Sequence, residues 1–317
     1  DSGNYPMALE KTLQAIDYEK FKKEIQPKLR AEGRHKGIGI IMFTEGTAVG
    51  PYEGAKVMVG VTGKVNVVCA YSNQGQGHYT TLAQICASQL GVKVTDINVV
   101  IGDTGQFQWG VGAFASRGIT LVGTAVHQAS LKVREKALEL GSKLLNTPKE
   151  ELELEDGCIR IADLPEKSIS LGELAMKANP TRGTVEEGME PGLEAAAYYG
   201  PPHGATGFGC LGMIIDVDAE TCKPKIERLV LTDDCGTPIN PMIVDGQLHG
   251  GLQMGIGESF YEKLVYDEYG QMVTASYMDY LFPQASDMPA KMEIKHSVTP
   301  SPLNPLASFG SCSGEKL

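Results

Sequence analysis

The sequence offers little covalent or metal-based means of holding the chain together. Its 317 residues contain seven cysteines, an odd number, and no two of them form a CxxC pair. This usage argues against a disulfide framework and against an iron–sulfur or zinc site in the chain. A reducing cytoplasm is therefore the expected compartment.

Long apolar runs, a secretion signal and a net positive charge are also lacking. No uninterrupted apolar stretch is long enough to cross a bilayer, and the opening DSGNYPMALEK has no basic region followed by an apolar one. The formal net charge is -11 with no block of like charges, so neither nucleic-acid duplexes nor anionic membranes are natural partners. The apolar content of 42% predicts one large or two medium globular domains.

One arrangement of elements occurs twice. A hairpin is predicted from Lys56 to Ala70 and another from Cys210 to Asp234, and each leads into a polar glycine-rich loop and a helix. We therefore expect an α+β fold of two quasi-equivalent lobes, built from β-hairpins and mixed sheet with packed helices. The Pro/Gly-rich stretch 179–209 is the predicted connection, and it divides the chain into lobes 1–178 and 179–317.

The remaining elements follow from periodicity and turn residues. The clearest is a helix near 122–146, where apolar residues recur every three or four positions and Pro148 follows as a stop. Further helices are expected at 79–90 and 171–177, and strands at 38–43, 97–104 and, as a pair, 151–161.

The first loop, SNQGQGHYTTLAQ, concentrates amide side chains and glycines in front of a helix. In an extended backbone Gln74, Gln76 and His78 would project on one side, while Gly75 and Gly77 let a ligand approach the main chain. Amides donate and accept hydrogen bonds together, which suits a heterocycle or a metal oxo group better than simple phosphate. Consistently, there is no GxxxxGK(S/T), and no GxGxxG opens a helix after a strand. A solvated loop that caps the helix is the alternative, and composition does not separate the two.

A second glycine-rich loop, GQFQWGVGAFASRG, precedes the strong helix. Ser116 and the free N–H groups of the helix start can bind an anion, and Arg117 can add a bidentate clamp. Taken alone, an N-cap with a surface arginine is the simpler interpretation. Trp109 either narrows a substrate channel or is a packed loop aromatic.

The third loop, DDCGTPINP, has structural explanations for several residues. Asn240 can cap a helix with Pro241 at its first position. Cys235 can face a cofactor, although buried free cysteines usually pack. The glycines that follow would cost an isolated helix roughly 1 kcal/mol each relative to alanine, which suggests close approach of another backbone or a flat ligand.

The remaining ionisable candidates have ordinary explanations. Glu315, in SCSGEKL, would pass as a terminal exposed charge. Four histidines share no ligand spacing, so structural or surface roles are expected for His127, His203, His249 and His296.

Several long motifs in order resemble the molybdenum hydroxylase (xanthine oxidase) family. They are SNQGQGHYTTLAQICASQLGV, GDTGQFQWGVGAFASR, DDCGTPINPMIVDGQLHGG, TPSPLNP and the terminal SGE. DSGNYP and EPGLEAAAYYGPP are also similar to the aerobic carbon monoxide dehydrogenase branch of its large subunits. The resemblance covers nearly the whole chain but only the C-terminal part of that subunit.

The resemblance implies a xanthine oxidase-type fold that holds molybdenum through molybdopterin cytosine dinucleotide, with no metal ligand supplied directly by the protein. It also implies that three sets of residues meet this cofactor. They are Gln74, Gly75, Gln76, Gly77 and His78; Phe114, Ala115, Ser116 and Arg117; and Cys235, Gly236, Thr237, Ile239, Asn240 and Gln247.

The family's chemistry implies roles for Glu315 and for partner chains. The substrate carbon receives oxygen from a metal-bound hydroxide, with Glu315 as general base. The electrons would leave through [2Fe-2S] clusters and FAD in partner subunits, because this chain has no motif for either group. A further chain would supply the missing upstream molybdopterin lobe, in an expected dimer of heteromers. The alternative is a non-catalytic scaffold, and PLASFGSCSGE departs from the family's usual glycine-lysine-glycine pattern before the glutamate.

Overall fold

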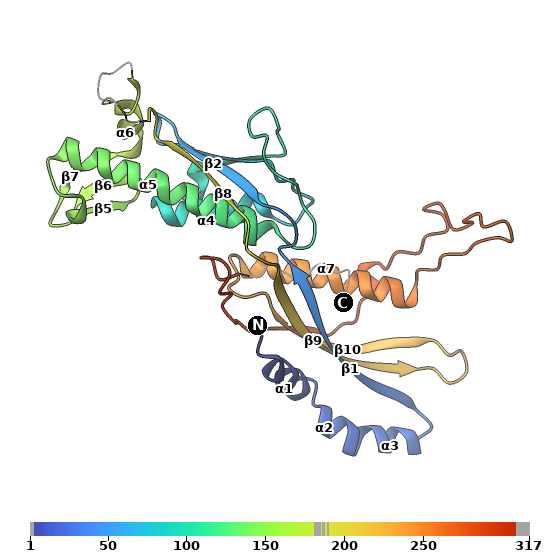
Figure 1. The fold of residues 1–317 in the computed structure, drawn as a ribbon. Helices are drawn as coiled ribbons and strands as arrows, with labels where there is room; N and C mark the ends of the chain where they lie inside the picture. Colours follow the sequence, from blue (N-terminus) through green and yellow to red (C-terminus); the bar gives the residue numbers. More distant parts are fainter. Residues whose placement is uncertain (1–2, 181–184, 186–187, 189, 309–317) are drawn as a thin grey trace. The chain divides into compact units, whose positions relative to one another are not determined.

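Two compact units, each with its own sheet, make up the described chain (Figure 1). The structure, a computed structural model, describes residues 3–180, 185, 188 and 190–308. Unit 1 contains Asp1–Thr47 and Ala205–Pro302, and unit 2 contains Ala48–Gly204 and Leu303–Ser308. Within the described residues, no helix combines the length and apolar content that crossing a membrane requires.

Unit 1 is built on a four-stranded sheet in the order β1-β9-β10-β11. The strands are β1 (His35–Thr47), β9 (Ala205–Val217), β10 (Pro224–Asp234) and β11 (Met292–His296). The first three are antiparallel neighbours, and β11 runs parallel to β10. The long pairing of β1 with β9 joins two segments that are far apart in the sequence.

Helices cover both faces of this sheet (Figure 1). One face carries α1 (Tyr5–Ala15), α2 (Tyr18–Lys20), a π-helical turn (Phe21–Ile25) and α3 (Gln26–Ala31), and the other carries α7 (Pro241–Phe260). Ile16 and Phe21 pack with Val230 on the first face. Leu229 and Leu231 pack with α7 on the second, as alternation along β10 requires.

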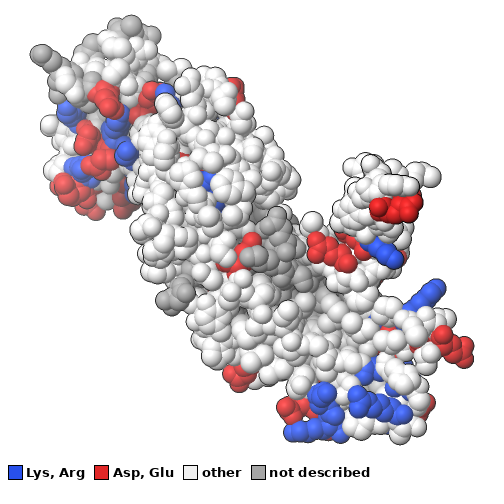
Figure 2. Space-filling model, turned by 45° about the vertical axis from the view of Figure 1, so that its right-hand side comes forward, with Lys and Arg blue, Asp and Glu red and all other residues white. Residues whose placement is uncertain are grey.

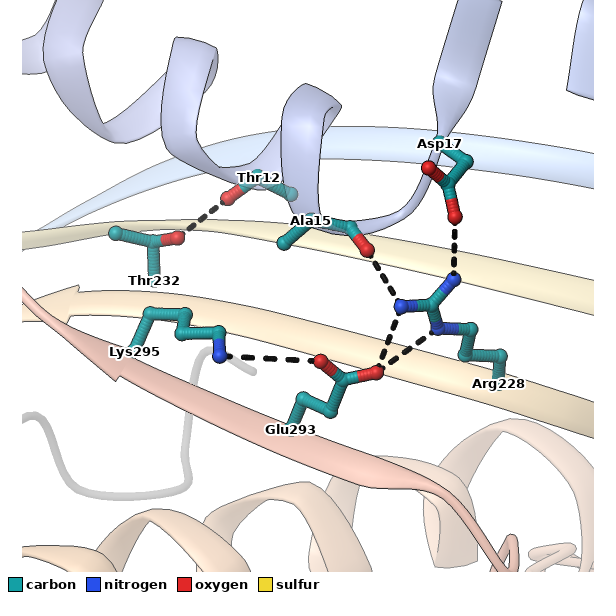
Figure 3. Close-up of polar contacts among 7 residues, drawn as sticks. All are labelled: Thr12, Ala15, Asp17, Arg228, Thr232, Glu293 and Lys295. Carbon is teal, nitrogen blue, oxygen red and sulfur yellow. Dashed lines mark hydrogen bonds and ion pairs between the residues drawn. The ribbon is translucent and has the colours of Figure 1, made fainter. Parts of the chain in front are cut away.

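Arg228 ties three elements of unit 1 together (Figure 3). Its guanidinium donates to the Ala15 carbonyl at the end of α1 and to Glu293 of β11, the latter at 2.7 and 3.0 Å, and pairs with Asp17 at 3.2 Å. A β-bulge between Ile226 and Arg228 lies at this position of β10. One side chain therefore connects the end of α1 to the sheet edge.

Unit 2 contains a second four-stranded sheet, in the order β4-β3-β2-β8, and a small three-stranded one. The first comprises β2 (Glu53–Val59), β3 (Val65–Cys69), β4 (Ile97–Ile101) and β8 (Glu194–Tyr199). The small sheet comprises β5 (Leu152–Glu155), β6 (Cys158–Ile161) and β7 (Leu164–Ser170). Charged side chains gather over the end of unit 2 that carries this small sheet (Figure 2).

The helices of unit 2 pack against its larger sheet. They are α4 (His78–Leu90), α5 (Thr124–Leu145), which continues a π-helical turn (Gly118–Gly123), and α6 (Leu171–Lys177). Short 3-10 turns occur in this unit at Val94–Asp96 and Lys149–Glu151, and in unit 1 at Ala285–Asp287. The long apolar stripe predicted near 122–146 is buried, with Val126, Ala129 and Val133 fully covered.

Most predicted elements are confirmed, including both hairpins and their following helices. Two expectations differ from the structure. The stretch 179–209 is not only a connection, because β8 and the start of β9 lie in it. The compact units also differ from a linear division after residue 178, because β1 pairs with β9 along its whole length and so places the first 47 residues in unit 1.

Replacement of Arg228 by methionine is expected to lower the free energy of unfolding by about 1–2 kcal/mol, because it removes charge-assisted hydrogen bonds from a partly exposed site. Lys295→Met is the control, since its nitrogen lies 3.9 Å from Glu293 and the side chain is half exposed. That variant should change the free energy by less than about 0.5 kcal/mol. Chemical denaturation followed by circular dichroism measures both, and equal effects would contradict the role given to Arg228.

Candidate functional site

The first loop turns back on itself instead of running extended. Gly75 and Gly77 have φ angles of 100° and 78°, which L-residues rarely adopt. Gln74 is exposed, and Gln76 folds back so that its side-chain oxygen accepts a hydrogen bond from the Gln74 backbone N–H. The expectation that the glutamines and His78 project on one side of an extended strand is therefore wrong, because the two glycines coil the chain.

The main chain of this loop is open to a ligand. In the described part of the chain, no atom lies within 4 Å of a Cβ built on Gly75. Asn73 caps the following helix, since its side-chain oxygen accepts from the His78 backbone N–H at 3.4 Å. This hydrogen bond supports the capping interpretation, and ligand binding by the other residues of the loop stays a prediction.

His78 is the buried end of the first loop. Its side chain is 7% exposed, and burial lowers its pKa to about 4, so the imidazole is neutral at physiological pH. The ring meets Tyr71 edge to face at 4.9 Å. A Cβ on Gly118 would lie 2.3 Å from His78 Nε2, so only glycine lets the start of α5's π-helical turn approach it. Among the described residues, Nδ1 has no hydrogen-bond partner.

The second loop has a strained backbone where it enters that π-helical turn. Ala115 and Ser116 both adopt left-handed φ angles, 46° and 47°, which cost non-glycine residues free energy and persist only when the surroundings hold them. The Ala115 carbonyl accepts from the Ala48 N–H at 3.1 Å. Phe114 is exposed, whereas Ser116 is half-buried.

Arg117 is completely buried, which excludes the surface position that the simpler interpretation gave it. Its guanidinium pairs with Glu53 at 3.1 Å, and both side chains are 0% exposed. It also donates to the Pro51 carbonyl at 2.5 Å and lies 4.6 Å from the centre of the Phe114 ring. Burial lowers the pKa of Arg117 while Glu53 opposes that shift. The guanidinium therefore pairs with groups of the protein itself. The sequence had suggested that it clamps a bound anion.

Glu53 is the organising residue that the sequence analysis missed. Besides Arg117, its Oε1 accepts from the backbone N–H groups of Val111 and Gly112 at 2.9 and 3.0 Å. A Cβ on Gly110 would lie 2.4 Å from Oε2, so this glycine lets the loop close over the carboxylate. The alternation of side chains along the strand could have indicated that Glu53 is buried. Glu53 begins β2 on the same buried face as Ala55 and Val57.

Trp109 lines a surface hollow of about 420 Å³ with Tyr52 and Tyr198. It is 59% exposed, so it is not a packed loop aromatic. The hollow therefore adjoins the loop that Glu53 fixes.

The third loop lies in unit 1 and is organised by Asp234. Its carboxylate accepts from the Gly236 N–H at 3.0 Å and from the N–H and hydroxyl of Thr299 at 3.1 and 2.7 Å. Asn240 caps α7 as predicted, because its side-chain oxygen accepts from the Ile243 N–H at 3.2 Å and Pro241 begins the helix. Thr237, Ile239 and Gln247 are half-buried.

Cys235 and Asp233 are buried beside this loop. Cys235 packs in the apolar cluster under α7, and burial, followed by the charges of Asp233 and Asp234, raises its thiol pKa. Burial, with Asp234 and Glu45, raises the pKa of Asp233 to about 7. Neither carboxylate oxygen of Asp233 has a hydrogen-bond partner in the described chain. Glu315 lies outside the described residues.

The protein family described as the molybdopterin cofactor-binding domain matches residues 11–289, most of the chain. The chain belongs to this family. It is 36% identical over 326 residues to the carbon monoxide dehydrogenase large chain of Afipia carboxidovorans, which covers 98% of this chain and 40% of that one. The resemblance to molybdenum hydroxylase large subunits is thereby confirmed.

Solved structures agree on the fold. Reconstituted CO dehydrogenase from Oligotropha carboxidovorans superposes with a TM-score of 0.89 at 35% identity, over 99% of this chain and 40% of that chain. Quinoline 2-oxidoreductase from Pseudomonas putida 86 gives 0.88 at 35% identity, over 99% and 41%. The molybdopterin-binding chain thus spans about two fifths of the length of these relatives.

The two loops of unit 2 fit the cofactor that defines the family. The neutral His78 ring has an unpartnered Nδ1 in the described chain, Gly75 leaves space beside the main chain, and the Gln74 amide is exposed. These groups match a ligand with several donors and acceptors. Within the residues described, no three His, Cys, Asp or Glu side chains are placed to hold a metal ion.

Replacement of Glu53 by glutamine should leave Arg117 as a buried charge without a counterion and lower the free energy of unfolding by about 3–5 kcal/mol. The emission of Trp109, the single tryptophan, should shift at the same time, because its loop loses the carboxylate that holds it. The double variant Glu53→Gln/Arg117→Met, which removes both charges, should recover most of the stability. A Glu53→Gln variant with unchanged stability and emission would refute this role.

Asp233 makes stability depend on pH with a defined sign. Its folded pKa of about 7 lies above the usual aspartate value of 3.8, so the folded state binds the proton more tightly and stability falls as pH rises between these values. Asp233→Asn should match the native chain near pH 4 and exceed it at pH 8 by up to about 4 kcal/mol. Denaturation curves across this range measure the difference, which a pH-independent gap would contradict. Asp234→Asn should instead lower stability near pH 4, because it weakens the acceptor of three hydrogen bonds. It should also reduce the pH dependence, because the Asp234 charge contributes to the raised pKa of Asp233.

Proposed function

We propose that this chain is the molybdopterin-binding part of a molybdenum-dependent hydroxylase or dehydrogenase. The reaction oxidises a small substrate with water as the oxygen source and releases two electrons and two protons. The observation that carries the proposal is the pair of loops in unit 2, His78 against Gly118 and Glu53 beneath Gly112, in a chain of this family. When bound, the cofactor supplies the two-electron redox chemistry.

The chain's own residues bind and position the cofactor in this proposal. Gln74 and Gln76 offer amide groups, and Gly75 and Gly77 admit the pterin to the main chain. His78 offers a neutral ring nitrogen, since its pKa is about 4. A neutral ring adds no charge beside a redox centre. Because its pKa lies well below physiological pH, its protonation state and its hydrogen bonds stay the same across the physiological range.

The second and third loops are proposed to complete the cofactor contacts. Phe114, Ala115 and Ser116 would line it, with Arg117 acting from behind through its pair with Glu53. In the other unit, the residues proposed to meet the cofactor are Cys235, Gly236, Thr237, Ile239, Asn240 and Gln247. Asp234 supports them by fixing the Gly236 N–H.

Glu315 is proposed as the general base. Its carboxylate would accept a proton from the oxygen nucleophile as the substrate is attacked, and a dry pocket would raise its basicity. The scaffold alternative, in which this chain binds cofactor without supplying a base, makes the opposite prediction for the same residue.

Substrate and partners are proposed at the level of class. The relatives include a carbon monoxide dehydrogenase and a quinoline oxidoreductase, which supports carbon monoxide or an N-heteroaromatic compound as substrate. An aldehyde is the third proposed class. Electrons would pass to [2Fe-2S] and FAD subunits, and another polypeptide would supply the upstream lobe in a dimer of heteromers. A reducing cytoplasm is the proposed location.

Replacing Glu315 by glutamine in the assembled complex should lower turnover by roughly 10²- to 10⁴-fold with the molybdenum content unchanged, because only the base is lost. Glu220→Gln, in the exposed turn between β9 and β10, is the control and should be fully active. Turnover unaffected by the first variant supports the scaffold. Metal and pterin analysis of the native complex is the companion measurement, and a complex without molybdenum or pterin would overturn the proposal.

A further inference from the structure

Tyr71 is a buried tyrosine of unit 2 that immediately precedes the first loop. It is 2% exposed and lies two residues beyond the end of β3, which runs between β2 and β4 in the sheet. Its backbone N–H donates to the Cys69 thiol, and the Cys69 carbonyl accepts from the Gly102 N–H at 3.3 Å. The main chain of Tyr71 is therefore anchored to the end of a central strand before the loop begins to coil.

The ring of Tyr71 is held by His78 and Gly118. The two aromatic rings meet edge to face, with 4.9 Å between their centroids and 79° between their planes. A Cβ on Gly118 would lie 2.3 Å from His78 Nε2 and 2.7 Å from the Tyr71 hydroxyl oxygen. The same glycine thus adjoins both side chains, and buried contacts fix the position of the phenol oxygen.

The hydroxyl of Tyr71 meets Gln76, the second glutamine of the loop. Burial raises the pKa of Tyr71 to about 12, and a hydrogen bond with the Gln76 side chain opposes that rise. Because the Gln76 side-chain oxygen accepts from the Gln74 backbone N–H, the amide NH₂ group is the donor to the phenol oxygen. The two ends of one amide therefore connect the anchored tyrosine to the loop main chain, and one N–H and one lone pair remain for a ligand.

Gln76 closes the turn that carries the open part of the loop. The Gln74 side chain is exposed, and in the described part of the chain no atom lies within 4 Å of a Cβ built on Gly75. Glycine adopts positive and negative φ angles about equally, so Gly75 and Gly77 permit the coil without holding it. The amide of Gln76 supplies a contact that holds it.

Tyr71 also lies near the buried pair under the second loop. After burial and the hydrogen bond with Gln76, the next influences on its pKa are the charge of Glu53, which raises it, and the charge of Arg117, which lowers it. A phenol whose pKa is about 12 keeps its proton at physiological pH, so the group that meets Gln76 is neutral. Tyr71 thus stands between the charges that fix the second loop and the amides of the first.

We propose that Tyr71 is a positioning residue for the cofactor-binding loop and that it acts through Gln76. Its hydroxyl fixes the Gln76 amide, the amide fixes the Gln74 N–H, and the turn at Gly75 stays open to the pterin as a result. This inference rests on the proposed function, because the pterin is the ligand that the loop is proposed to bind. Positioning from a strand end gives a loop the precision that it lacks by itself.

Replacing Tyr71 by phenylalanine in the purified native complex tests this role, because the variant loses the hydroxyl and keeps the ring against His78. The rate at which the complex releases pterin and molybdenum should rise about tenfold, the size of effect expected from one buried hydrogen bond. Tyr198→Phe, a half-exposed tyrosine on β8 of the same unit, is the control and should leave the rate unchanged. A Tyr71→Phe complex that retains its pterin as long as the unsubstituted complex would overturn the proposal.

A double-mutant cycle separates positioning through Gln76 from a general loss of stability. Gln76→Ala breaks the same contact from the loop side and should itself speed release at least tenfold. Tyr71→Phe should then change the rate by less than twofold in the Gln76→Ala background. A tenfold effect in that background would show that Tyr71 acts by another route and would contradict the proposal. So would unchanged release from Gln76→Ala alone, which can be measured even if Tyr71→Phe does not assemble.

Analysis of the unsubstituted complex keeps this inference distinct from the proposed function. A complex that contains neither molybdenum nor pterin before any substitution would overturn the proposed function and this role with it. A loaded complex that is indifferent to Tyr71→Phe would overturn the role of Tyr71 alone. Release of the pterin is measured without turnover, so the result does not depend on the identity of the substrate.

Discussion

The buried pair of Glu53 and Arg117 is the constraint on which the rest of the unit 2 site depends. Two charges taken out of water are tolerated only when they are paired and hydrogen-bonded. Here one carboxylate oxygen serves the guanidinium and two backbone N–H groups, and the guanidinium also reaches the Pro51 carbonyl. The pair therefore fixes the segment before β2 against the glycine-rich second loop. Ala115 and Ser116, the left-handed residues of that loop, are fixed with it.

The groups proposed to meet the cofactor in the first loop are neutral. His78 is kept uncharged by burial, and Gly118 meets it at a distance that no side chain would permit. Charge is placed behind the loops, where it fixes their shape, and amides and a neutral ring stand where the cofactor is proposed to bind.

The sequence predicted only part of the candidate site. The three loops and the Asn240 cap were predicted because amide-rich, glycine-rich and capping patterns are local. Glu53 was missed, and Arg117 was expected at the surface, because their burial arises from pairing between segments 64 residues apart. The burial of Asp233 and the coiled backbone at Gly75 and Gly77 could not be predicted from composition either. Each depends on the main chain that surrounds it.

The sequence by itself determined the elements and the family. Hairpins, helix ends and the stripe of α5 follow from periodicity and turn chemistry within about twenty residues. The tertiary structure alone decided that His35–Thr47 joins Ala205–Val217 in one sheet, that β8 lies in the stretch expected to be a connection, and that Arg117 is buried against Glu53. The reason is that strand partners and burial are fixed by contacts between distant segments, whose free energies no local pattern records.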